Sequence, residues 1–290
     1  MRSFIKKAIG FALLLVVPVV LIYVVCYFQK DKKYSNETVY VWGDSQMFQG
    51  LDVELLSMGL SKPVVSSSKH GSGIYDFLVS IEHVPESSTC IVAFPECAFY
   101  RLFRRYYNQT GLEFHAIMTM FEAGAPAEDC VRAFIKNRYH FFSCDNVFNS
   151  SHNLYPYAPQ LDYIQPLSWF GEVFGKRAVA SDWRIRAYKT GVSQLLKKDC
   201  RVLIIQFPFE SQVEEHAIHS ESRKKSERLK HTLFEEFPII PDTIVLHNDS
   251  LLFHDLSHFN EVAAKRLTLE VLDVMKKDTI GNYFIYVEVK

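Results

Sequence analysis

Short apolar runs alternate with helical patterns along this chain, and this alternation restricts the fold more than any other feature. Runs with the length of buried strands lie at 38–42, 64–65, 90–94, 201–207 and 243–247. Between them, apolar residues recur at helical spacing, most clearly over 182–198, 210–236 and 260–277. Strands that alternate with helices indicate a parallel sheet with helices on both faces. We therefore expect an α/β fold, a three-layer α/β/α sandwich around a five-stranded, mostly parallel sheet of flavodoxin-like type.

The interval from about 98 to 181 does not follow this alternation. It is rich in Phe, Tyr, Arg and Asn, and it is too long for a simple connection between two elements. We interpret it as an insertion that lies over the strand ends and helps to form a substrate groove. The alternative is that its aromatic side chains pack in a small core of their own.

An uncharged apolar segment covers residues 8–28, which is long enough to cross a hydrocarbon layer of about 30 Å. One arginine and two lysines precede it, as is typical of a cytoplasmic N-terminus. A cleaved signal peptide is the alternative, but its apolar core is usually shorter and ends in small residues. We expect residues 1–34 to form a cytoplasmic stub, a single membrane anchor and a juncture. Residues 35–290 then form one extracytoplasmic domain, periplasmic or on the outer face of the cell.

Composition excludes several classes of function. A formal net charge of -1 gives no electrostatic basis for binding nucleic acid. The chain has neither a phosphate-binding loop nor a dinucleotide-binding glycine motif, and its Cys and His residues lack zinc-type spacing, so we expect no cofactor and no metal. Of the six cysteines, Cys26 lies in the apolar N-terminal segment. One or two disulfides among the other five are compatible with the sequence, which does not select their pairing.

The first predicted strand stops at Gly43-Asp44-Ser45, and a helical pattern follows directly. Ser45 would then stand at the carboxyl edge of the sheet, close to a helix N-terminus that favours negative charge. This position suits a nucleophile, but a serine hydroxyl attacks poorly at neutral pH without a base. The alternative is an ordinary turn that contains a serine by chance.

Asp255 and His258 lie three residues apart, between the last predicted strand and a long helical pattern. Such a turn lets the carboxylate hold one ring nitrogen of the imidazole while the other ring nitrogen faces the serine. Considered singly, Asp255 is explained as a helix cap and His258 as a surface histidine. Considered together with Ser45, they predict a triad in which Ser45 is the nucleophile, His258 the base and Asp255 the group that orients the base.

The two blocks that carry this triad, Gly43-Asp44-Ser45 and Asp255-Leu256-Ser257-His258, resemble those of the SGNH or GDSL-type hydrolases and acyltransferases. The resemblance implies an oxyanion hole formed by the backbone N–H groups of Ser45 and Gly71, with Gly73 as the substitute for Gly71. An anchored domain of this kind is also similar to bacterial proteins that acylate envelope polymers beside a membrane-bound O-acyltransferase. This similarity implies that the substrate is an acylated glycan.

The third block of the family is absent. The family normally has G-x-N-D after the third strand, with an Asn side chain that completes the oxyanion hole, whereas this chain has Pro95-Glu96-Cys97. An ionised Glu96 cannot donate a hydrogen bond. Glu96 is expected instead to hold an arginine, to contact a substrate hydroxyl or to have only a structural role. Asp44, Gly73 and Glu96 are the candidate substrate-binding residues.

The sequence thus predicts an anchored serine esterase or O-acyltransferase that acts on acyl, chiefly O-acetyl, esters of an envelope or exported glycan. Hydrolysis and transfer share one acyl-enzyme intermediate, so the sequence does not separate them. The alternative function is a catalytically weak domain that binds glycan or serves as a scaffold for a membrane-bound O-acyltransferase.

Overall fold

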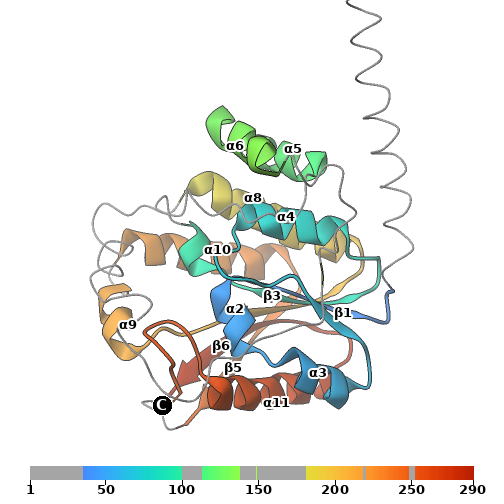
Figure 1. Cartoon of the computed structure of the whole chain (residues 1–290), viewed down its shortest axis with the longest axis vertical. Helices are drawn as coiled ribbons and strands as arrows, with labels where there is room; N and C mark the ends of the chain where they lie inside the picture. Colours follow the sequence, from blue (N-terminus) through green and yellow to red (C-terminus); the bar gives the residue numbers. More distant parts are fainter. Residues whose placement is uncertain (1–34, 100–112, 138–147, 149–180, 218–219, 248–251) are drawn as a thin grey trace, which may run out of the picture.

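The computed structural model describes residues 35–99, 113–137, 148, 181–217, 220–247 and 252–290 (Figure 1). Within this part of the chain, six strands form one sheet in the order β2-β1-β3-β4-β6-β5, and all neighbours are parallel. The strands are β1 (Val39–Trp42), β2 (Val64–Ser66), β3 (Thr89–Ala93), β4 (Arg201–Gln206), β5 (Ile239–Leu246) and β6 (Asn282–Val289). The α/β class and the parallel sheet are confirmed, whereas the expected number of five strands is wrong.

The strand missing from the sequence-based prediction is β6, which pairs with both β4 and β5. It buries Phe284 and Ile285 completely in the sheet. Its neighbour β5 also differs from expectation, because it begins at Ile239 and includes Pro241. A proline is tolerated there because β5 is an edge strand with a single partner, where a missing backbone donor disrupts no second ladder.

Helices flank both faces of the sheet (Figure 1). One face carries α4 (Ile74–Glu82), α8 (Asp182–Lys197) and α10 (Glu221–Glu236), and the other carries α3 (Val53–Leu60) and α11 (Glu261–Lys277). The short helix α2 (Ser45–Gly50) contacts α11. The helix expected over 210–236 is instead two helices, α9 (Ser211–Ala217) and α10. A new helix begins here because Ser220 caps it: its Oγ accepts a hydrogen bond from the Arg223 N–H at 3.0 Å.

The described part of the predicted insertion comprises the end of η1 (Glu96–Phe99) and the helices α5 (Phe114–Glu122) and α6 (Ala127–Asn137). Helix α5 packs on α4 and α8, and Figure 1 shows α5 and α6 outside that helix layer. These two helices therefore extend the helical layer and do not lie over the strand ends. The rest of the predicted insertion lies outside the described residues.

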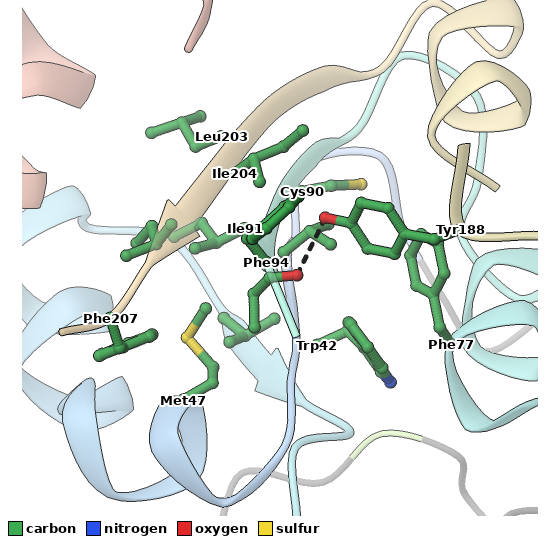
Figure 2. Packing of buried hydrophobic residues seen from close by; sticks show 14 of the residues in the cluster. Trp42, Met47, Phe77, Cys90, Ile91, Phe94, Tyr188, Leu203, Ile204 and Phe207 are labelled. Carbon is green, nitrogen blue, oxygen red and sulfur yellow. Dashed lines mark hydrogen bonds between the residues drawn. The ribbon is translucent and has the colours of Figure 1, made fainter. Parts of the chain in front are cut away.

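Aromatic packing fixes the carboxyl end of β3 against the helix layer (Figure 2). The Trp42 and Phe77 rings lie 4.6 Å apart between centroids, and the Phe77 and Tyr188 rings 5.1 Å apart. The buried Tyr188 hydroxyl on α8 donates a hydrogen bond to the Ala93 carbonyl at 2.9 Å. This bond satisfies the only polar atom of the buried Tyr188 side chain. It also holds Ala93, the last residue of β3, next to the candidate site.

Four cysteines lie in the described part of the chain, Cys90, Cys97, Cys130 and Cys200, and all four are free thiols. The Cys200 thiol, just before β4, donates to the Pro85 carbonyl at 3.5 Å. The neighbouring Cys200 side chain and burial raise the pKa of Cys90 well above its usual value.

Among the residues that the structure describes, none of the helices is both long enough and apolar enough to cross a bilayer. The predicted anchor, residues 8–28, lies outside this set.

Candidate active site

The predicted blocks lie at the point where the strand order reverses. In the sheet, β1 lies between β2 and β3. The chain therefore runs from β1 to β2 on one side and then crosses back to form β3 on the other side of β1. The connection after β1 forms α2 and α3 on one face of the sheet, whereas the connection after β3 leads to α8 on the opposite face (Figure 1). Open α/β sheets bind ligands outside the carboxyl ends of their strands at such a point. Ser45, the first residue of α2, lies there.

The glycine of the first block is required by close packing. A Cβ atom on Gly43 would lie 2.1 Å from the Met47 Cβ and 2.9 Å from the Ala93 Cβ. Neither neighbour can move freely, because both side chains are fully buried. Gly43 therefore lets α2 start immediately beside the end of β3, which places the following residues at the sheet edge.

The acid of the first block begins the helix that carries Ser45. Asp44 is the N-cap of α2, and its Oδ1 accepts the Gln46 N–H at 3.0 Å. Burial raises the pKa of Asp44, although the hydrogen bond from Gln46 and the charge of nearby His258 act in the opposite direction. Asp44 thus has a structural role at the helix start and lies close enough to His258 to interact with it electrostatically. Ser45 itself is partly exposed.

Asp255 and His258 form a close, buried pair. The His258 Nδ1 atom lies 2.8 Å from both carboxylate oxygens of Asp255, and the Ser257 and His258 backbone N–H groups donate to Oδ1 at 2.8 and 2.9 Å. Burial alone would raise the pKa of Asp255, but the hydrogen bond and charge of His258 and these N–H groups lower it below the usual 3.8. An ionised carboxylate only accepts, so His258 donates through Nδ1 and its Nε2 lies on the opposite side of the ring.

Asp255 is not the cap of the following helix, which was the alternative explanation for this residue. Asn260 caps α11, and its Oδ1 accepts the Val262 and Ala263 N–H groups at 3.0 and 3.1 Å. The loop is closed by a hydrogen bond from the His254 N–H to the His258 carbonyl at 2.8 Å. The loop thus holds the imidazole and its carboxylate in one fixed arrangement.

Gln46 connects the two blocks. Its Nε2 donates to the Ser257 carbonyl at 3.1 Å and to the Pro208 carbonyl at 3.4 Å. Gln46 directly follows Ser45, and Ser257 directly precedes His258. This buried contact between segments far apart in sequence brings the serine block and the histidine block to the same part of the sheet edge, as the predicted triad requires.

The two candidate glycines differ in what their backbones do. Gly71 has a φ of 70°, the left-handed conformation that favours glycine, in a loop attached to the first block by the hydrogen bond from Lys69 N–H to the Gly43 carbonyl at 3.4 Å. Gly73 is the N-cap of α4, and its N–H donates to the Asp76 carboxylate at 2.9 Å. The Gly73 N–H is therefore already bonded at the start of α4. Gly71 is for this reason the stronger candidate for the oxyanion hole.

Glu96 holds an arginine, one of the roles expected for it. Its Oε1 lies 2.7 Å from the Arg223 Nε, and the Arg223 Nη2 also lies 2.9 Å from Glu214. Glu96 is 2% exposed; burial raises its pKa, and Arg223 partly offsets this. Glu96 thus belongs to an ion-pair network between η1 and α10.

His70 is the neighbour of the site to which the sequence interpretation assigned no role. On α2, Ser45, Phe48 and Gln49 share a face, and His70 packs on that face with its ring 5.1 Å from Phe48. The Gln49 Nε2 lies 3.2 Å from the His70 Nε2. Because an amide nitrogen only donates, His70 accepts there and carries its proton on Nδ1.

The His70 ring also lies 6.2 Å from the His258 ring. Burial and the nearby His258 charge lower the pKa of His70, so its neutral form is favoured. In the sequence, only the position of His70 next to Gly71 indicates that it lies near the site. Its contacts with Phe48, Gln49 and His258 join segments that are distant in the sequence.

No protein-family model matches the chain, and no curated protein matches it significantly. Within the described ranges, no group of three or more His, Cys, Asp or Glu side chains is arranged to hold a metal ion.

Proposed function

We propose that this chain is a membrane-anchored, extracytoplasmic serine esterase or O-acyltransferase of SGNH type that acts on O-acyl esters of an envelope or exported glycan. The observation that carries the proposal is the buried Asp255–His258 pair, held on the sheet edge that also carries Ser45. The strand order agrees with a flavodoxin-like sheet over β2-β1-β3-β4, with β6 in the fifth place and β5 added outside it. The anchor, the extracytoplasmic location and the glycan are supported by the sequence.

In the proposed reaction, the Ser45 Oγ attacks the ester carbonyl and His258 accepts its proton through Nε2. Asp255 stabilises the imidazolium that forms. The backbone N–H groups of Ser45 and Gly71 donate to the oxyanion. His258 then returns the proton to the departing alcohol, which leaves an acyl group on Ser45. Water or a sugar hydroxyl attacks this ester, again with His258 as base, and the serine is restored.

His70 takes the place of the missing oxyanion asparagine in this proposal. It packs on the face of α2 that carries Ser45, its neutral form is favoured, and Gln49 fixes its proton on Nδ1. A neutral imidazole N–H is a competent side-chain donor for a developing oxyanion.

Substitution of His70 by alanine should lower kcat by about 100-fold with little change in KM, because an oxyanion donor acts mainly in the transition state. The amide nitrogen of asparagine occupies nearly the same position as Nδ1 of histidine, whereas that of glutamine corresponds to Nε2. His70→Asn should therefore retain most of the activity and His70→Gln should not. Equal activity of the asparagine and alanine variants would contradict the assignment.

A fluorophosphonate probe tests the proposed nucleophile directly. The full-length chain in detergent should be labelled once, and peptide mass spectrometry should place the adduct on Ser45. An adduct on another serine would contradict the proposed mechanism.

The second candidate function, a catalytically weak glycan-binding domain or scaffold for a membrane-bound O-acyltransferase, is favoured by one observation. The residue at the expected position of the asparagine block is Glu96, which is engaged in ion pairs. This function predicts a folded protein that no fluorophosphonate labels and that co-purifies with the acyltransferase.

A further inference from the structure

A second site lies beside the proposed active site. A cavity of about 790 Å³ opens at the carboxyl ends of β4 and β6, next to α9 and α10. None of the triad residues lines it. The two sites are neighbours, because Pro208 lines the cavity and its carbonyl accepts the hydrogen bond from Gln46. The cavity therefore continues along the sheet edge on which Ser45 lies.

The cavity wall contains a buried polar atom that requires a partner. Gln206, the last residue of β4, is 8% exposed and lines the cavity. Its Nε2 faces the Glu96 carboxylate at 3.5 Å, which fixes the orientation of the amide. Within the described part of the chain, its Oε1 has no hydrogen-bond partner. A buried carbonyl without a donor is unfavourable, so this wall is suited to a ligand that carries hydroxyl or N–H groups.

The charges of the lining select the sign of the ligand. Five glutamates line the cavity, against one arginine and one lysine. Both cations are already paired with carboxylates, Arg223 with Glu96 and Glu214, and Lys230 with Glu227 at 2.5 Å. Among the glutamates, Glu288 is paired with Lys290 at 2.8 Å, outside the lining, so the lining still carries more carboxylates than cations. An anionic ligand would therefore meet an excess of negative charge, whereas an ammonium group would be stabilised.

Aromatic rings supply the apolar part of the wall, namely Phe207, Phe209, Phe253 and Tyr286. Such rings pack against the C–H face of a sugar ring and attract ammonium groups. We propose that the cavity binds an amino-sugar unit with a free ammonium group. The ammonium group faces the glutamates, a hydroxyl or N–H donates to the Gln206 Oε1, and the ring packs on the aromatic wall. This binding does not depend on the chemistry at Ser45.

The proposal is tested by calorimetric titration of the full-length chain in detergent with three β-1,4-linked disaccharides, of glucosamine, glucose and glucuronate. The glucosamine disaccharide should bind at least about tenfold more tightly than the glucose disaccharide, and the glucuronate disaccharide should not bind. Raising the salt concentration should weaken this preference, because it rests on charge. Absence of binding, or equal binding of the neutral or acidic disaccharide, would overturn the proposal.

Variants of the wall locate the binding. Gln206→Leu should weaken the glucosamine disaccharide by about tenfold, the effect of one lost hydrogen bond. Glu215→Gln removes an exposed charge of the lining and should weaken it by about two- to threefold at low salt. Glu54→Gln changes an exposed residue of α3 outside the lining; it is the matched control and should bind like the parent.

Ser45→Ala separates the two proposals, because it should abolish turnover and leave sugar binding unchanged. If Gln206→Leu unfolds the protein, the pair Glu215→Gln and Glu54→Gln still decides the question. Unchanged affinity in Glu215→Gln at low salt would place the sugar elsewhere and refute the assignment.

Discussion

The Ser45→Ala variant is expected to lose turnover of p-nitrophenyl acetate by about four to six orders of magnitude, the range found for removal of a catalytic serine. The loss should be in kcat, because Ser45 forms the covalent intermediate and contributes little to ester binding. Alanine is well tolerated at the first position of α2, and the cap from Asp44 to the Gln46 N–H remains, so the fold should be retained. Residual turnover then reports solvent hydrolysis and the oxyanion donors alone.

Ser193→Ala is the control for this measurement. Ser193 lies on α8, in the helix layer away from the first block, and its substitution should leave turnover and the melting temperature unchanged. Circular dichroism and thermal unfolding of both variants separate lost chemistry from lost structure. If Ser45→Ala keeps turnover within about tenfold of the parent, the serine mechanism is wrong and the scaffold function is the better description.

The fold was predictable where strands are buried on both faces. β1, β3 and β4 appear in the sequence as continuous apolar runs, which is the pattern of central parallel strands. β6 gives a weaker signal, since it carries partly exposed Tyr286 and exposed Glu288 among its buried residues. The start of β5 could not be predicted because the strand contains Pro241. A proline indicates the end of a strand unless the strand is known to lie at the edge of the sheet.

The site was predictable to the extent that its contacts are local. Asp255 and His258 are three residues apart, so their pairing follows from a single turn. The Arg223 partner of Glu96 and the position of His70 against Gln49 depend on how segments that are distant in the sequence pack together, which no local pattern encodes. The glycine of the first block was recognised from its motif, but its cause, contact with Met47 and Ala93, is visible only in the packed structure.

The Asp255→Asn variant should retain most of the site geometry and lose about 10⁴-fold in kcat, because an amide neither fixes the His258 tautomer nor stabilises its imidazolium. It should also be less stable at neutral pH by about 2 kcal/mol, since the buried carboxylate accepts from the His258 Nδ1 and from two backbone N–H groups. Kinetics on p-nitrophenyl acetate and urea unfolding at neutral pH measure the two losses.

The pH dependence of unfolding distinguishes this pair from a merely well-packed loop. The pKa of Asp255 in the folded protein is lower than its usual 3.8, so its ionised form stabilises the fold above that pH and the contribution is lost as the pH falls through the lower folded value. In Asp255→Asn this part of the acid destabilisation should disappear, whereas Asp273→Asn, on the exposed face of α11, should keep it. An unfolding free energy with the same acid dependence in the parent and in Asp255→Asn would show that the carboxylate is not the charged partner of His258, and the base would then lack the group that orients it.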